Sequence, residues 1–127
     1  MIKVLLITAG GAAGTLLRYW LSGLSYKIGG EAFPWGTLVV NLIGAFFIGL
    51  LWGLTNHSGL SSQLRAMLFI GIFGGFTTFS TFALESFNLF KDQQFRYAFY
   101  YILASNIAGV LLVFGGLVLS RLIIHIK

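Results

Sequence analysis

The chain has 127 residues, of which 57% are hydrophobic and only 9% are charged. An average soluble domain carries about 25% charged residues, so this composition excludes an ordinary soluble domain and indicates an integral membrane protein. The net charge of +5 comes from basic residues scattered singly along the chain, which favours anchoring at a membrane surface and argues against nucleic acid as a partner. The absence of cysteine excludes disulfides and thiolate chemistry.

Apolar stretches without a charge recur along the whole sequence. One helical crossing of a bilayer takes about 20 residues, so four crossings with short connections use up the chain. We therefore predict an all-α membrane protein with a single four-helix transmembrane domain over residues 1–127. The predicted spans cover about residues 4–24, 35–54, 63–90 and 95–124.

The first predicted span, residues 4–24, contains a GxxxG pair and one charge. Gly10 and Gly14 permit a neighbouring helix to approach closely. Arg18 lies inside the span, where a lone arginine costs about 2.5–3.5 kcal/mol on insertion scales. Two roles stay open for Arg18: its side chain extends to the membrane interface, or it draws anions into a vestibule.

The second predicted span, residues 35–54, follows the only proline, Pro34, and begins with Trp35, a residue typical of the membrane interface. Its one strongly polar side chain is Asn41. Because a buried amide needs hydrogen-bond partners, Asn41 either joins two helices or lines a polar path. The span alone favours the helix-joining role.

The third predicted span, residues 63–90, contains the stretch GIFGGFTTFSTF from Gly71 to Phe82. Its glycines and threonines make a poor continuous helix, and irregular backbone survives in a membrane only when it is buried in protein or lines a cavity. We predict a broken helix with Gly74 and Thr77 flanking the break. Carbonyls freed at such breaks bind Na⁺ in some transporters, although an ordinary kink with hydroxyls bonded to the preceding turn is also consistent.

After the break, Phe79 and Phe82 are spaced to share one helix face, with Ser80 and Thr81 beside them. Ring edges carry partial positive charge, so these edges and the hydroxyl donors could together solvate an anion. Ring faces could instead favour a cation. Glu85, near the far end of the span, is expected at a depth that water reaches.

The fourth predicted span, residues 95–124, has Ser105 and Asn106 as its mid-span polar residues, and Tyr101 shares a face with Ser105. His57, in the second connection, has no nearby acidic residue or histidine and is expected to be a solvated loop residue. The sequence contains no nucleophile–base pair and no metal cluster, so we do not expect an enzyme.

Basic residues give almost no preference for one orientation in the membrane. With four crossings, one side carries Lys3, Arg65, Arg121 and Lys127, and the other carries Lys27, Lys91 and Arg96. Orientation follows the Lys/Arg bias of short loops, and four against three is a weak bias. Insertion in both orientations would permit an antiparallel homodimer with its two-fold axis in the membrane plane.

The whole chain resembles the bacterial Fluc (CrcB-like) fluoride ion channel family. The resemblance rests on the glycine-rich first span with its arginine, on PWGTL followed by VN and G, on GGFTTFSTFALE, and on YxxxS in the fourth span. It implies a passive, fluoride-selective channel that exports fluoride across the bacterial inner membrane and so relieves fluoride toxicity. It also implies a dual-topology homodimer in membrane lipid, with two pores and a central structural Na⁺.

The resemblance further implies roles for individual residues. Gly74 and Thr77 would offer backbone carbonyls to the Na⁺, and Arg18 and Glu85 would be vestibule charges. Asn41 moves from a helix-joining role to the pore. The implied fluoride pathway consists of Asn41, Phe79, Ser80, Thr81, Phe82, Tyr101 and Ser105. Asn106 stays an alternative to Ser105 as the pore-facing residue.

Two other functions are alternatives to the channel. A small dual-topology multidrug exporter needs an ionisable group inside the membrane, and the only charge well inside a predicted span is Arg18, which cannot cycle protons. A packing subunit without transport would not need the broken, hydroxyl-rich centre of the third span. The sequence therefore favours a channel over an exporter and over a packing subunit.

Overall fold

The computed structural model describes residues 1–30, 32–56 and 58–125. The described chain is helical, with the elements α1 (Ile2–Gly29), α2 (Trp35–Thr55), α3 (Ser62–Ala66), the π-helix η1 (Met67–Ile72), α4 (Phe73–Phe76), α5 (Phe79–Lys91) and α6 (Phe95–His125). The predictions made for His57, and the positions of Glu31 and Lys127, fall outside the described residues.

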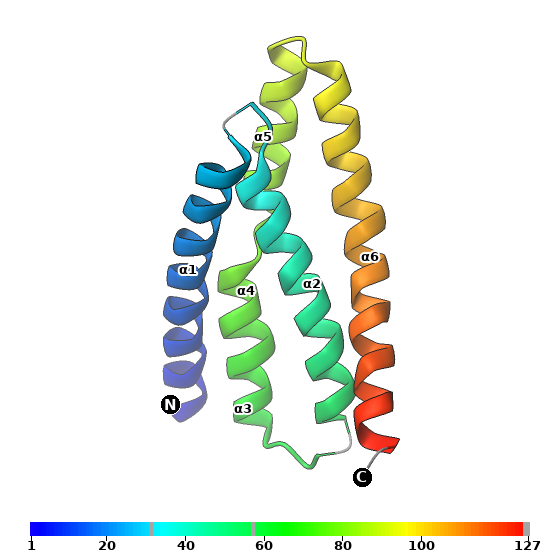
Figure 1. Ribbon diagram of the computed structural model, residues 1–127. Helices are drawn as coiled ribbons and strands as arrows, with labels where there is room; N and C mark the ends of the chain where they lie inside the picture. Colours follow the sequence, from blue (N-terminus) through cyan, green and yellow to red (C-terminus); the bar gives the residue numbers. More distant parts are fainter. Residues whose placement is uncertain (31, 57, 126–127) are drawn as a thin grey trace.

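Four helical stretches are long and apolar enough to cross a membrane: α1, α2, the composite stretch Ser62–Lys91, and α6. Both termini lie at the same end of the molecule as the connection between α2 and α3, and the other two connections lie at the opposite end (Figure 1). Among the described residues, this up-and-down arrangement gives four candidate spans, as expected of a multi-pass membrane protein.

The first helix is longer than the prediction. We placed its end near residue 24, whereas α1 continues to Gly29 and ends where Gly30 adopts a positive φ of 80°. The Gly30 N–H donates to the carbonyl of Tyr26 at 2.9 Å, which closes the last turn. Glycine tolerates this backbone conformation, and Lys27 in the last turn suits the negative end of the helix dipole.

Glycines bring α1 directly onto the first half of the third span. A Cβ added to Gly14 would overlap the carbonyl oxygen of Ile72, and one added to Gly10 would come within 2.7 Å of the carbonyl oxygen of Met67. The GxxxG pair therefore serves helix packing, as the sequence predicts. A similar close approach joins α2 to α6, where Gly49 faces the backbone of Val113.

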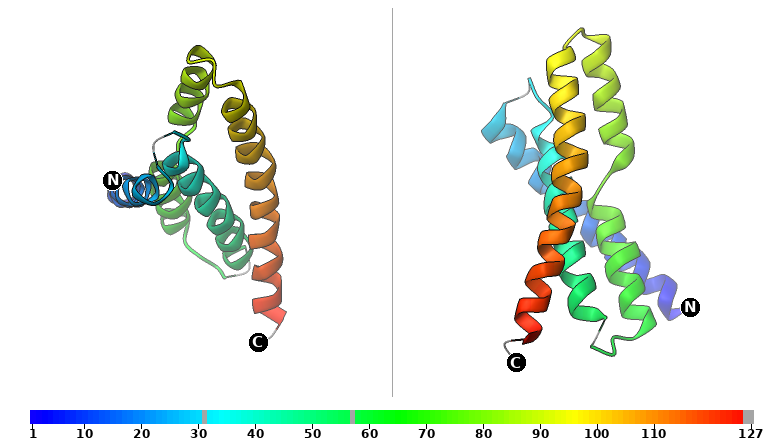
Figure 2. Two further views of the ribbon diagram at one scale, coloured as in Figure 1. Left: turned by 45° about the horizontal axis from the view of Figure 1, so that its top comes forward. Right: turned by 90° about the vertical axis from the view of Figure 1, so that its right-hand side faces the viewer.

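The third span is interrupted, as predicted, but its details differ. It begins with α3, continues through the π-helix η1 and the short α4, and then becomes extended at Thr77 (φ −84°, ψ 159°) and Thr78 (φ −148°, ψ 118°) before α5 begins. Figure 2 shows the non-helical link between its two halves. Gly74 lies inside α4, one turn before the break, and the π-helix was not predicted.

A small buried cluster holds α5 and α6 against α2. It consists of Leu38, Leu89, Ala98 and Tyr101, with Phe33, Leu42, Phe82 and Ala104 packed against it. Many large apolar side chains elsewhere are exposed on the single chain, as expected of surfaces that face lipid or another protein.

Candidate functional site: a broken helix between two cavities

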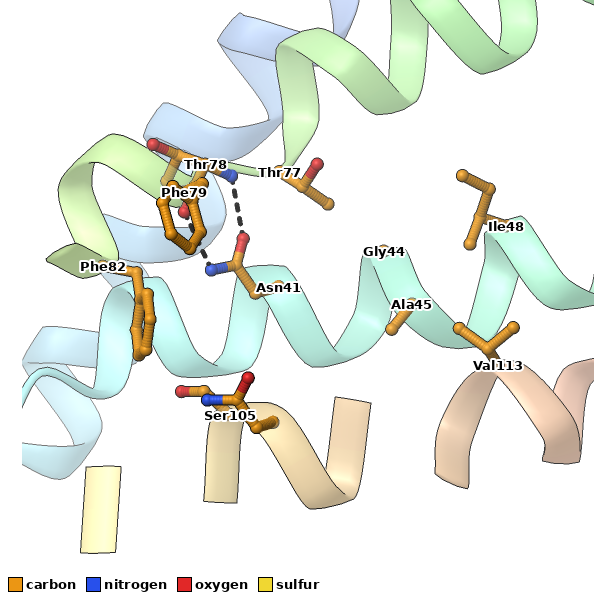
Figure 3. A pocket seen from close by; sticks show the side chains of 11 residues that line it. Asn41, Gly44, Ala45, Ile48, Thr77, Thr78, Phe79, Phe82, Ser105 and Val113 are labelled. Carbon is orange, nitrogen blue, oxygen red and sulfur yellow. Dashed lines mark hydrogen bonds between the residues drawn. The ribbon is translucent and has the colours of Figure 1, made fainter. Parts of the chain in front are cut away.

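The break in the third span is held by the amide of Asn41 on α2. Its Oδ1 accepts a hydrogen bond from the Thr78 N–H at 2.8 Å, and its Nδ2 donates to the Thr78 carbonyl at 3.0 Å (Figure 3). The amide thus satisfies both backbone groups of an extended residue inside the membrane, where unpaired groups are costly. Asn41 does join two helices, which was the first of the two roles considered for it.

Further hydrogen bonds complete the break. The Thr77 carbonyl accepts from Arg18 Nη1 at 3.4 Å, and the Thr77 hydroxyl donates back to the carbonyl of Phe73 at 2.8 Å. Thr78 caps α5: its hydroxyl accepts from the Thr81 N–H at 3.3 Å and donates to Thr81 Oγ1 at 2.9 Å. Sequence reasoning did not assign a role to Thr78, although threonine is a preferred N-cap residue.

The first cavity, of about 350 Å³, lies on one side of the break. Asn41, Phe79, Phe82 and Ser105 line it, together with Gly44, Ala45, Ile48, Thr77, Thr78, Asn106 and Val113 (Figure 3). The rings of Phe79 and Phe82 lie 5.8 Å apart at 48°. They share one face, as their spacing predicts.

Ser105 contributes an uncommitted hydroxyl to this cavity. Within the part of the chain that the structure describes, its buried Oγ has no hydrogen-bond partner. The neighbouring Asn106 also lines the cavity, but its Nδ2 donates to the carbonyl of Ile102 on its own helix at 2.7 Å. Ser105 Oγ is therefore uncommitted, whereas Asn106 has one of its two Nδ2 hydrogens committed within its own helix.

The second cavity, of about 370 Å³, also borders the break, through Thr78. Its lining is polar and contains Arg18, Tyr26, Thr37, Thr78, Thr81 and Glu85, together with Thr15, Tyr19, Ser22 and Val40. The two residues predicted as vestibule charges, Arg18 and Glu85, therefore share one cavity. Thr78 lines both cavities, and the second has the more polar lining of the two.

Three hydroxyls converge on the carboxylate of Glu85. Its Oε1 accepts from Tyr26 and from Thr37, each at 2.9 Å, and its Oε2 accepts from Tyr101 at 2.7 Å. Sequence reasoning assigned no role to Tyr26 or Thr37. Thr37 lies in the PWGTL motif, which could have drawn attention to it, whereas Tyr26 was placed in a connection.

The structure thus distributes the predicted pathway over several places. Asn41, Phe79, Phe82 and Ser105 line the first cavity, and Thr81 lines the second. Tyr101 is fully buried and lines neither cavity; its hydroxyl bonds to Glu85. Ser80 is exposed and also lines neither, with its hydroxyl 3.5 Å from that of Thr78.

Among the described residues, no group of three His, Cys, Asp or Glu side chains could hold a metal ion. The oxygen atoms available at the break are backbone carbonyls and hydroxyls. Because the Thr78 N–H donates to Asn41, the helical bond from Thr78 to the Gly74 carbonyl is not formed. Gly74 is also exposed on the single chain.

A membrane bundle with a broken helix and two cavities that meet at the break has the architecture expected of an ion-conducting or transport protein. Comparison with known proteins identifies the protein family. Residues 5–117 match the family described as CrcB-like protein, Camphor Resistance (CrcB), and the chain belongs to this family.

Individual relatives cover almost the whole chain. It is 44% identical over 124 residues to the fluoride-specific ion channel FluC of Parabacteroides distasonis, an alignment that spans 98% of this chain and 97% of the relative. It is 46% identical over 122 residues to the protein of the same name from Solidesulfovibrio magneticus, with 95% and 98% of the two chains covered. The FluC protein of Geobacter sulfurreducens is likewise 46% identical over 122 residues, with the same coverage. These matches confirm the family resemblance.

Proposed function

We propose that this protein is a fluoride-specific ion channel that lets fluoride leave the cell passively and so relieves fluoride toxicity. The observation that carries the function is the likeness, over nearly the full chain, to relatives named fluoride-specific ion channels. Such relatives are channels and not enzymes, and we assign this chain no catalytic reaction. We further propose the bacterial inner membrane as its location.

The first cavity supplies weak, neutral donors for a small hydrated anion. Ion conduction needs groups that replace water but do not hold the ion tightly. The free hydroxyl of Ser105 and the ring edges of Phe79 and Phe82 meet this requirement. Asn41 keeps a second Nδ2 hydrogen after its bond to Thr78, so it can both hold the break and contact the ion.

The second cavity combines a positive and a negative side chain. Arg18 provides the attraction that brings an anion to this side of the break. Glu85 would repel the anion, but its carboxylate accepts bonds from three hydroxyls, which stabilise and disperse its charge. The hydroxyl of Thr81 lines the same cavity and continues the path of neutral donors.

The multidrug exporter is not favoured, although one argument against it changes. Glu85 is half-buried among hydroxyls, so Arg18 is not the only ionisable residue within the helices. The case against proton-coupled export rests instead on family membership, since the relatives are named ion channels.

Ion efflux from liposomes that contain the purified protein tests the proposed function. We expect rapid fluoride efflux, measured with a fluoride electrode, and negligible chloride efflux measured in the same way. Liposomes without protein provide the leak rate. Equal rates for the two anions, or fluoride efflux at the leak rate, would show that the protein is not a fluoride-specific channel.

We propose an antiparallel, dual-topology homodimer as the working form. The near-balanced basic residues support insertion in both orientations. Phe79, which lines the first cavity, is 79% exposed on the single chain, as expected if a second copy completes that wall.

Because the chain has no cysteine, Lys3→Cys provides a single reactive site near the N-terminus. We expect an impermeant maleimide to label about half of Lys3→Cys from each side of the membrane; labelling from one side only would exclude this dimer.

We also propose a structural Na⁺ held by the backbone carbonyls of Gly74 and Thr77. The residues fit such an ion: the Gly74 carbonyl lacks its helical bond from Thr78, and the bond from Arg18 to the Thr77 carbonyl is long. When bound, the ion would supply positive charge that ties exposed carbonyls together. We expect the midpoint of thermal unfolding (Tm) to be higher in NaCl than in N-methylglucamine chloride at equal ionic strength. Identical Tm values would remove the ion from the proposal.

A further inference from the structure

The connection between α1 and α2 places an aromatic side chain, Phe33, against the hydroxyl cluster at Glu85. Phe33 lies outside the helices, just before Pro34, yet it packs against the buried cluster of α2, α5 and α6. Its ring centroid lies 5.7 Å from that of Tyr101 at 83° and 5.8 Å from that of Tyr97 at 80°. Both are edge-to-face arrangements, which are directional contacts between rings.

Tyr101 is the member of the hydroxyl cluster whose position depends most on packing. Its side chain is fully buried, and its ring packs against Phe33 at 5.7 Å and against Phe82 at 5.2 Å. Its hydroxyl makes the shortest of the three bonds to Glu85, at 2.7 Å. The phenol oxygen lies on the χ2 axis, so it moves only when χ1 changes, and the rings that pack against Tyr101 restrict χ1.

We propose that Phe33 is a positioning residue that holds the Tyr101 hydroxyl on Glu85. The inference rests on the proposed channel function, because it assigns Phe33 a part in shaping the polar cavity that the anion crosses. Phe33 itself lines neither that cavity nor the cavity of Phe79 and Phe82. It acts through Tyr101: without the Phe33 ring, Tyr101 can change χ1, and Glu85 then loses the donor that stabilises its charge at Oε2.

Four proteins test this inference: the wild type, Phe33→Leu, Tyr101→Phe and the double variant. In the wild-type background, Phe33→Leu is expected to slow fluoride efflux about threefold to tenfold, the range that corresponds to loss of its pair with Tyr101 alone. In the Tyr101→Phe background, where the hydroxyl is already absent, Phe33→Leu is expected to change efflux by less than about twofold, because ring and hydroxyl act as one unit.

Matched controls separate positioning from general packing. Phe99→Leu removes an aromatic pair with Tyr100 on an exposed face of α6 and is expected to leave efflux unchanged. Phe33→Tyr keeps the ring and is expected to retain wild-type efflux. If Phe33→Leu does not yield a folded protein, Phe33→Met replaces it in the same cycle. Equal loss of efflux on both backgrounds, or no loss on either, would overturn the proposal.

A second readout separates this inference from the channel function itself. The Tm of the same four proteins measures the coupling between Phe33 and the Tyr101 hydroxyl without any transport. We expect the decrease in Tm caused by Tyr101→Phe to be smaller when Phe33 is already leucine. If the wild-type protein shows no fluoride efflux but the Tm changes are coupled, the channel function is rejected and the contact between Phe33 and Tyr101 is retained. If the Tm changes of the two substitutions are additive, the positioning role of Phe33 is rejected.

Discussion

Asn41→Leu is expected to reduce fluoride efflux about a hundredfold. Leucine has a similar size but cannot accept from the Thr78 N–H or donate to its carbonyl, and both bonds are made by the wild-type amide. Each buried backbone group left without a partner costs about 1–3 kcal/mol. A total loss of about 2.8 kcal/mol corresponds to a factor of one hundred. The extended link would shift to find other partners, and both cavities that it borders would change shape.

Asn106→Leu is the matched comparison for this prediction. This substitution also removes an asparagine side chain from the first cavity. The Nδ2 of Asn106, however, donates to a carbonyl of its own helix and not to the break. We expect Asn106→Leu to slow efflux by about threefold or less, and to lower the Tm less than Asn41→Leu does. Equal efflux from wild type and Asn41→Leu would mean that the break does not depend on this amide.

The sequence predicts the spans well because their signal is local. Charges are absent from the stretches that became α2 and the centre of α6, and each helix in a membrane must satisfy its own backbone. The largest error is the end of α1. The sequence around Ser25 and Tyr26 resembles a polar connection, but Tyr26 finds a partner in Glu85, 59 residues away along the chain.

The break shows where local reasoning reaches its limit. The glycines at positions 71, 74 and 75 predict an irregular helix, but two of them serve another purpose: Gly71 and Gly75 let the third span lie against the backbone of α1. The extended residues are Thr77 and Thr78, stabilised by Asn41 from another helix. That partnership has no signature in residue spacing, and neither does the π-helix. Similarly, the hydroxyl donors to Glu85 come from three other helices, so residue spacing gives no sign of them.

Phe79→Ile and Phe82→Ile are each expected to abolish measurable fluoride efflux, a loss of at least about a hundredfold. Both rings line the first cavity, and isoleucine has no positive ring edge to offer an anion. The structure predicts that the two substitutions differ in their effect on stability. Phe82 is half-buried and its ring lies 5.2 Å from that of Tyr101, whereas Phe79 is 79% exposed on the single chain.

Phe82→Ile should therefore lower the Tm by about 2–8 °C, the shift that loss of about 1 kcal/mol produces in small domains. Phe79→Ile should lower the Tm less than Phe82→Ile does, because among the described residues the Phe79 ring pairs only with Phe82. Size-exclusion chromatography is expected to give the wild-type elution volume for both, which would show that lost efflux does not reflect lost assembly.

Efflux at the wild-type rate from both variants would remove the rings from the conduction path. Loss of efflux in Phe82→Ile alone would instead place the effect on Tyr101 and Glu85, because Phe82 contacts the Tyr101 ring and Phe79 reaches it only through Phe82.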